Sequence, residues 1–89
     1  MINCTPSRTI RWPLAELRTA APNTPLGAYA NIGHTDDIVG WTDTGDVSPA
    51  QYAGLGLDWL SLGARLVGGC CGTRPAHIAA LRAALDKAP

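Results

Sequence analysis

The sequence predicts an α/β fold in which parallel strands alternate with helices. Residues 26–31 form a short apolar run of strand length, residues 64–67 are predicted to form a second strand, and segments with helical spacing of apolar residues follow both. Residues 1–3 resemble the tip of a further strand ahead of the first helical segment. The resulting order of strand, helix, strand, helix, strand, helix is typical of right-handed βαβ units on one parallel sheet.

The first helix is predicted over residues 13–21. Pro13 suits a first helical turn, and Pro22 ends the helix. Apolar residues recur at helical spacing, at Leu14, Leu17 and Ala21. Trp12 just before this helix is expected to pack in the core or between helix and sheet.

The next helix has the clearest start. Ser48 is a capping residue, and Gln51 is placed to reach back to the cap. Gly63 is expected to end the helix, and two internal glycines weaken it by up to about 1 kcal/mol each relative to alanine. Its buried face is predicted to hold Tyr52, Leu55, Trp59 and Leu62.

The last helix is predicted to open at residues 73–75. Ile78, Leu81 and Leu85 are expected to line its buried face, and His77 is expected at the surface.

Residues 32–47 show neither helical nor strand periodicity and are predicted to form a long loop. Trp41 is expected to pack this loop against the rest of the fold, and the loop's aspartates are expected to face solvent.

Composition narrows the possible partners and compartments. The chain has 89 residues with seven basic and seven acidic side chains, so its net charge is zero. This balance disfavours binding to nucleic acid or to an anionic membrane. No apolar run approaches the roughly 18 to 20 residues that span a bilayer, and no signal-peptide core follows Met1. We therefore expect one small cytoplasmic domain.

Two adjacent cysteines, Cys70 and Cys71, lie among glycines after the predicted strand 64–67. Neighbouring Cα atoms are about 3.8 Å apart, below the usual disulfide range of roughly 4.4 to 6.8 Å, so we expect free thiols here. Cys4 and Asn31 also follow predicted strands, and the carboxyl ends of parallel strands meet at one edge. Three thiols at that edge would suit a soft metal, with zinc the best candidate and its fourth position open.

Three segments and the residues after them carry a resemblance. They are Ile2-Asn3-Cys4, Tyr29-Ala30-Asn31-Ile32-Gly33 and Gly68-Gly69-Cys70-Cys71-Gly72-Thr73, followed by Pro75, His77 and Ile78. Together they resemble the C-terminal part of the homocysteine S-methyltransferase family. That family is a (βα)8 barrel with a zinc ion held by three cysteines. The resemblance implies that residues 1–89 are the last three βα units of a TIM-type barrel, a C-terminal fragment of a homocysteine-binding domain.

The resemblance also implies a site. Cys4, Cys70 and Cys71 would be the catalytic zinc ligands, with zinc activating the homocysteine thiol to accept a methyl group from a donor and form methionine. Asn31 would lie near the metal as a substrate-binding residue or as the fourth ligand before substrate arrives. From the residues alone, Asn31 as a turn residue at the strand end is an equal alternative.

The predicted fragment has consequences for stability. Alone it would expose the barrel-facing side of its sheet and two open edges, so we expect it to need an N-terminal barrel partner or self-association. Two alternative hypotheses remain. One is a non-catalytic zinc-binding module, in which His34 or His77 joins the cysteines in a closed site. The other is an orphan fragment that neither folds nor binds metal.

Overall fold

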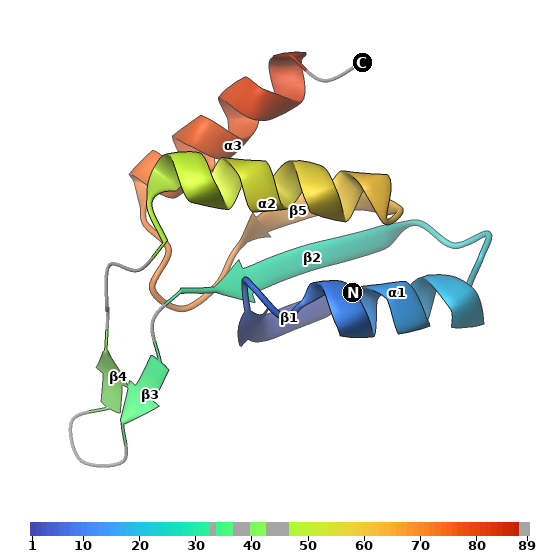
Figure 1. Cartoon of the computed structure of the whole chain (residues 1–89), viewed down its shortest axis with the longest axis horizontal. Coiled ribbons are helices and arrows are strands. Elements are labelled where there is room, and N and C mark those ends of the chain that lie inside the picture. The colour runs from blue at the N-terminus through green and yellow to red at the C-terminus, as the bar shows by residue number, and fades with distance from the viewer. Residues whose placement is uncertain (33, 37–39, 43–46, 88–89) are drawn as a thin grey trace.

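A computed structural model describes residues 1–32, 34–36, 40–42 and 47–87. Its elements are, in order, β1 (Ile2–Pro6), α1 (Arg11–Ala20), β2 (Leu26–Asn31), β3 (His34–Asp36), β4 (Gly40–Thr42), α2 (Pro49–Ser61), β5 (Ala64–Gly69) and α3 (Pro75–Lys87). Strands β1, β2 and β5 form a parallel sheet with β2 in the centre (Figure 1). The predicted α/β class with parallel strands alternating with helices is confirmed.

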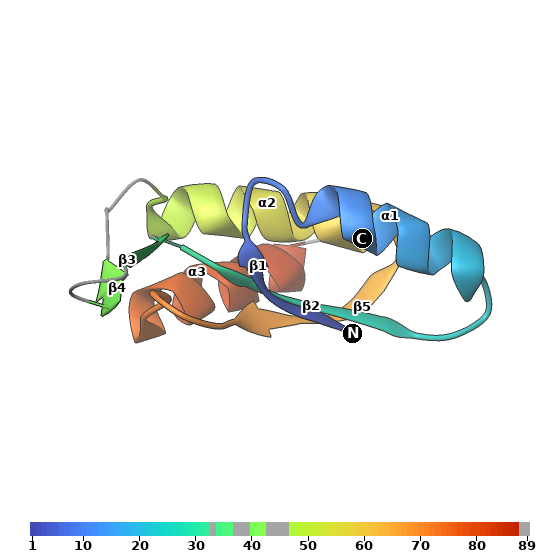
Figure 2. The ribbon, with the colours of Figure 1, turned by 90° about the horizontal axis from the view of Figure 1, so that it is seen from below.

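The helices cover one face of this sheet. Helices α1 and α2 lie along that face (Figure 2), and α3 packs chiefly against α2 while also contacting β5. The residues of β2 that point to this face, and Ile32 just after it, are at most 3% exposed: Leu26, Ala28, Ala30 and Ile32. Small side chains at two of these positions let the helices approach the sheet closely.

The other face of the sheet is uncovered by the described part of the chain. Tyr29, which is half-buried, lies between the buried Ala28 and Ala30 and so points to this face. A Cβ added at Gly27 would contact Met1 and Leu66, so these two side chains also lie on this face. Leu66 is 56% exposed and Met1 is 60% exposed. An apolar surface of this kind is typical of a sheet face that packs against further protein.

The start of α2 is as predicted. The Ser48 side chain accepts a hydrogen bond from the Gln51 amide at 3.2 Å, and the Gln51 side chain accepts one from the Ser48 amide at 2.9 Å. Gly63, with φ of +105°, follows the helix as its stop. Tyr52 and Trp59 are fully buried, whereas Leu55 and Leu62 pack partly buried against the same core.

Two predictions for α3 are wrong. His77 is 6% exposed rather than at the surface, and Ile78 is 43% exposed rather than buried. The buried stripe of α3 runs through His77, Leu81 and, partly buried, Leu85, which are four residues apart. Leu81 and Leu85 thus lie on the inner face as predicted, and His77 takes the place expected for Ile78, because its ring nitrogens find polar partners there.

Trp12 was also expected to pack inside, and this prediction is wrong. Helix α1 begins at Arg11, two residues earlier than predicted, and Trp12 in its first turn is 62% exposed. Leu14 is fully buried instead and Leu17 packs against the core.

None of the described helices is long and apolar enough to cross a membrane.

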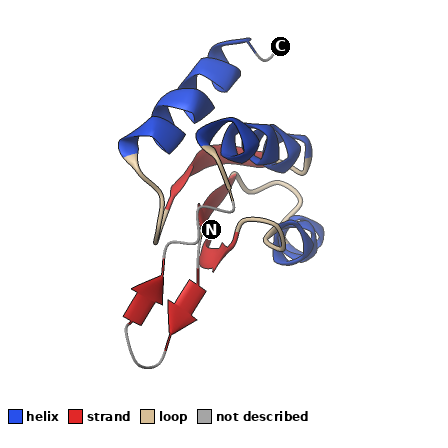
Figure 3. Cartoon of the chain, turned by 60° about the vertical axis from the view of Figure 1, so that its left-hand side comes forward, coloured by secondary structure: helices blue, strands red, loops and turns tan. Residues whose placement is uncertain are grey.

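The long loop predicted over residues 32–47 contains two strands, so that prediction is wrong. β3 and β4 pair antiparallel, with Thr35 opposite Trp41, and the pair projects away from the parallel sheet (Figure 3). Strands of three residues are too short to show an alternating pattern in the sequence. The predictions for the side chain of Trp41 and for the aspartates of this segment lie outside what the structure describes.

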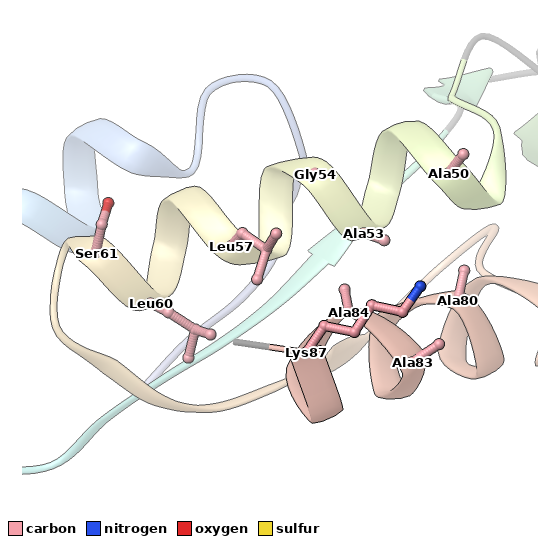
Figure 4. Close-up of a pocket in the computed structure, with 10 residues that line it drawn as sticks. All are labelled: Ala50, Ala53, Gly54, Leu57, Leu60, Ser61, Ala80, Ala83, Ala84 and Lys87. Atoms are coloured by element: carbon pink, nitrogen blue, oxygen red, sulfur yellow. The ribbon is translucent and has the colours of Figure 1, made fainter. Parts of the chain in front are cut away.

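A groove of about 940 Å³ runs between α2 and α3 (Figure 4). Gly54 lies on the groove side of α2, and a Cβ added there would meet no atom within 4 Å. Gly56 is different, because an added Cβ would collide with the buried Leu81 side chain of α3. Gly56 therefore permits the close approach of the two helices.

These two glycines provide a matched test of the packing. Gly54→Ala should raise the free energy of unfolding by up to about 1 kcal/mol, because alanine favours the helix and meets open space. Gly56→Ala should lower it by about 1 kcal/mol, because overpacking against Leu81 outweighs the helix propensity. Chemical unfolding followed by circular dichroism measures both. Equal stabilisation by the two substitutions would contradict the described α2–α3 contact.

Candidate metal centre

Three thiols converge at the carboxyl ends of the parallel strands. Cys4 lies in β1, while Cys70 and Cys71 lie in the loop between β5 and α3 (Figure 1). Their sulfur atoms are all within 4.8 Å of one another, and no other cluster of this kind occurs among the described residues. All three cysteines are free, and Cys70 and Cys71 form no bridge with each other, as expected for adjacent residues.

Cys4 reaches the cluster through an irregularity in β1. The strand was expected to end before Cys4, but it runs on to Pro6, so this prediction is wrong. Asn3 pairs with Tyr29 and Thr5 pairs with Ala30, which leaves Cys4 as an extra residue in the ladder. Its φ is +52°, the left-handed region that non-glycine residues rarely adopt. A bulge of this kind redirects a side chain, and such strain is common at functional sites.

The Cys70–Cys71 loop is held by main-chain hydrogen bonds. The Cys70 amide donates to the Ala30 carbonyl at 3.1 Å, and the Ile32 amide donates to the Cys71 carbonyl at 3.0 Å. The Thr73 hydroxyl donates to the Cys70 carbonyl at 2.7 Å. A Cβ added at Gly69 would collide with the Thr73 side chain, so only glycine lets Thr73 close this turn.

Asn31 lies at the end of β2, directly beside this loop. Its side-chain oxygen accepts a hydrogen bond from the Cys71 amide at 3.0 Å, and its main-chain carbonyl accepts one from Ser7 at 2.9 Å. Asn31 is only 6% exposed. The Asn31 side chain therefore holds the backbone of Cys71 in place. Contact of Asn31 with substrate or metal stays a prediction.

The sulfur atoms influence one another's protonation. A hydrogen bond between Cys4 and Cys70, together with smaller contributions, lowers the pKa of Cys70. The same hydrogen bond, together with desolvation and the charges of Cys70 and Cys71, raises the pKa of Cys4 to about 11. Three anionic sulfurs this close repel one another, and a bound cation would remove that repulsion.

His77 does not join this cluster. Its Nδ1 accepts a hydrogen bond from the Arg74 amide at 3.1 Å, which leaves Nε2 as the protonated nitrogen that donates to the Val47 carbonyl at 3.1 Å. Both ring nitrogens are thus occupied in fastening the start of α3 to the segment before α2. The side chain of His34 lies outside the described residues.

Comparison with known proteins identifies the family. A family model for homocysteine S-methyltransferase matches residues 1–85. This chain belongs to the homocysteine S-methyltransferase family.

Individual members of the family support the match. Homocysteine S-methyltransferase 2 of Zea mays is 34% identical over 90 residues, covering 99% of this chain and 26% of the maize protein. Homocysteine S-methyltransferase of Escherichia coli is 48% identical over 61 residues, covering 66% of this chain and 19% of that enzyme. Selenocysteine methyltransferase of Astragalus bisulcatus is 36% identical, covering 83% and 22% respectively. The matched part thus spans about a fifth to a quarter of the length of these relatives, and no solved structure matches the chain.

Within this family match, the three sulfurs form a group that could hold a metal ion. Thiolates favour soft or borderline ions such as zinc over magnesium or calcium. The sequence alone did not predict the supporting contacts of Asn31 and His77, because each depends on a main-chain group at least 30 residues away. The Thr73 hydroxyl, by contrast, binds a carbonyl only three residues before it. One signal was available for His77, because it lies four residues before Leu81 and so on the same helix face.

The support that Asn31 gives to Cys71 can be measured. Asn31→Ala should lower the free energy of unfolding by about 1 kcal/mol, because the part-buried hydrogen bond between the Asn31 side chain and the Cys71 amide is lost. Asn23→Ala is the matched control, since Asn23 is exposed in the turn before β2 and should change stability little. Chemical denaturation measures both variants, and equal stability of the two would contradict the described hydrogen bond.

Proposed function

We propose that this chain supplies the zinc-binding part of a homocysteine S-methyltransferase that transfers a methyl group to homocysteine and forms methionine. The convergence of Cys4, Cys70 and Cys71 within 4.8 Å is the observation that carries the proposal. The family match supports it, because the relatives in maize and E. coli are homocysteine S-methyltransferases.

The donor set suits zinc. With zinc–sulfur bonds of about 2.3 Å, two sulfurs in a tetrahedral site lie roughly 3.8 Å apart, so modest shifts of the three thiols suffice. When bound, zinc supplies deprotonation of the homocysteine thiol, which makes that sulfur nucleophilic at neutral pH. Three protein ligands leave the fourth position for this substrate sulfur.

The chain's own residues prepare the site for that chemistry. The hydrogen bonds of the Cys70–Cys71 loop to the end of β2 orient two ligands before any ion arrives. Asn31, as a substrate-binding residue, lies at the same strand end as these ligands. The reducing cytoplasm, where we place the protein, keeps the thiols available.

Activity requires more protein than this chain supplies. The chain spans about a quarter of its relatives' length, and its sheet has one uncovered face with Leu66 and Met1 exposed. We therefore include in the proposal that the three βα units complete a (βα)8 barrel with an N-terminal partner segment, which provides the rest of the homocysteine site. Self-association of the chain is the competing way to cover this face.

Zinc binding gives the first test. The purified chain should bind one zinc ion, and Cys4→Ser and Cys70→Ser should each weaken binding more than about 100-fold, because a lost ligand costs more than a lost supporting contact. Competition with a chelator measures the affinity, and Thr5→Ser is the matched control beside Cys4. X-ray absorption should then detect a fourth sulfur when homocysteine is added. Unchanged affinity in the two cysteine variants would contradict the proposed ligands, and exclusion of homocysteine would favour a closed structural site.

Complementation tests the need for a partner. The E. coli relative, produced without the segment that matches this chain, should gain homocysteine methylation when mixed with this chain, because the two parts then form one site. The Cys71→Ser chain is the control and should not restore activity. Methylation by this chain alone would contradict the requirement for a partner. Restoration by the relative's own segment but not by this chain would contradict the proposed function.

A further inference from the structure

Tyr52 of α2 contacts the sheet at the point where β5 leaves it toward the thiols. The residue is fully buried. Its hydroxyl donates to the Gly68 carbonyl at 2.7 Å and to the Ala30 carbonyl at 2.9 Å, sharing one proton between the two acceptors. Gly68 belongs to β5 and Ala30 to β2, so this single hydroxyl bridges the ends of the two strands.

The Tyr52 hydroxyl and the Cys70 amide share one acceptor. The Ala30 carbonyl that accepts from Tyr52 also accepts from the Cys70 amide at 3.1 Å. Gly68 lies two residues before Cys70 in the same strand and turn. Burial is the main reason that the pKa of Tyr52 rises to about 12, so the hydroxyl remains a donor at neutral pH.

The ring of Tyr52 has a separate role in packing. It meets Trp59 edge to face, with ring centres 5.4 Å apart, and His77 in the same manner at 5.7 Å. A phenylalanine would preserve both contacts. The Ala30 carbonyl also accepts a hydrogen bond from the Cys70 amide, so it would keep a partner if the Tyr52 hydroxyl were removed.

We propose that Tyr52 is a positioning residue for the metal centre, whose hydroxyl fixes the start of the Cys70–Cys71 loop against β2 and so sets the spacing between Cys70 and Cys4. This inference rests on the proposed metal-binding function. The hydroxyl of Tyr52 has this positioning role, whereas its ring only packs in the core.

The first test compares two matched substitutions in the full chain. Tyr52→Phe should weaken cobalt(II) binding about tenfold and alter the thiolate-to-cobalt absorption, because Cys70 is held less firmly. Tyr29→Phe should leave both unchanged. Tyr29 lies on the neighbouring strand, and its ring lies close to Gly68 on the opposite face of the sheet. Equal affinity and equal spectra for wild type and Tyr52→Phe would overturn the proposal.

A second variant separates the hydroxyl from folding. Tyr52→p-aminophenylalanine keeps an N–H donor at the same place and should recover wild-type cobalt affinity even if Tyr52→Phe loses helix content by circular dichroism. Failure of this variant to recover affinity while its helix content equals that of wild type would overturn the proposal.

A metal-free measurement distinguishes this inference from the proposed function. In a Cys71→Ser background only Cys4 and Cys70 remain, and a fluorogenic reagent that links two thiols reports their spacing. Tyr52→Phe should slow the cross-linking several-fold while leaving modification by a single-thiol reagent unchanged. If Tyr52→Phe slows the cross-linking while the chain with all three cysteines binds no metal, the positioning role is supported and the metal function is refuted. Unchanged cross-linking would refute the positioning role.

Discussion

The end of β2 holds both cysteine-bearing parts of the chain. The Ala30 carbonyl accepts from the Cys70 amide, the Asn31 side chain accepts from the Cys71 amide, and the Asn31 carbonyl accepts from Ser7 just beyond β1. Because β2 pairs in parallel with strands on both sides, these contacts bring the segment around Cys4 and the Cys70–Cys71 loop to the same end of the sheet, although they lie far apart in the sequence. The thiol cluster depends on this arrangement more than on any contact between the thiols themselves.

The backbone at Cys4 is strained. Cys4 has a positive φ in a bulge, which costs on the order of 1 to 3 kcal/mol for a non-glycine residue. Gly69 leaves space for Thr73 to close the next turn. Metal binding is a source of free energy that can offset such costs, since ligand geometry and folding are coupled in small metal-binding proteins. The buried face, by contrast, is built from regular apolar contacts.

Features that depend on residues close together in the sequence could be predicted. The Ser48 cap, the alternation of parallel strands with helices and the free cysteine pair all follow from local patterns and general rules. The family resemblance pointed to the partnership with Cys4. What escaped prediction depends on distant contacts. The bulge at Cys4 arises from unequal pairing with β2, and His77 is buried because the Val47 carbonyl accepts its proton. Sequence periodicity carries no information about either partner.

The central claim is that Cys4 and the Cys70–Cys71 pair bind one ion within one chain. The most direct measurement is ¹¹³Cd NMR of the full chain loaded with one equivalent of cadmium, with the cysteine β-protons assigned. We expect a single cadmium signal coupled to the β-protons of all three cysteines, at a shift typical of several thiolate ligands. A signal coupled to Cys70 and Cys71 but not to Cys4 would contradict it, as would coupling to cysteines of two different chains.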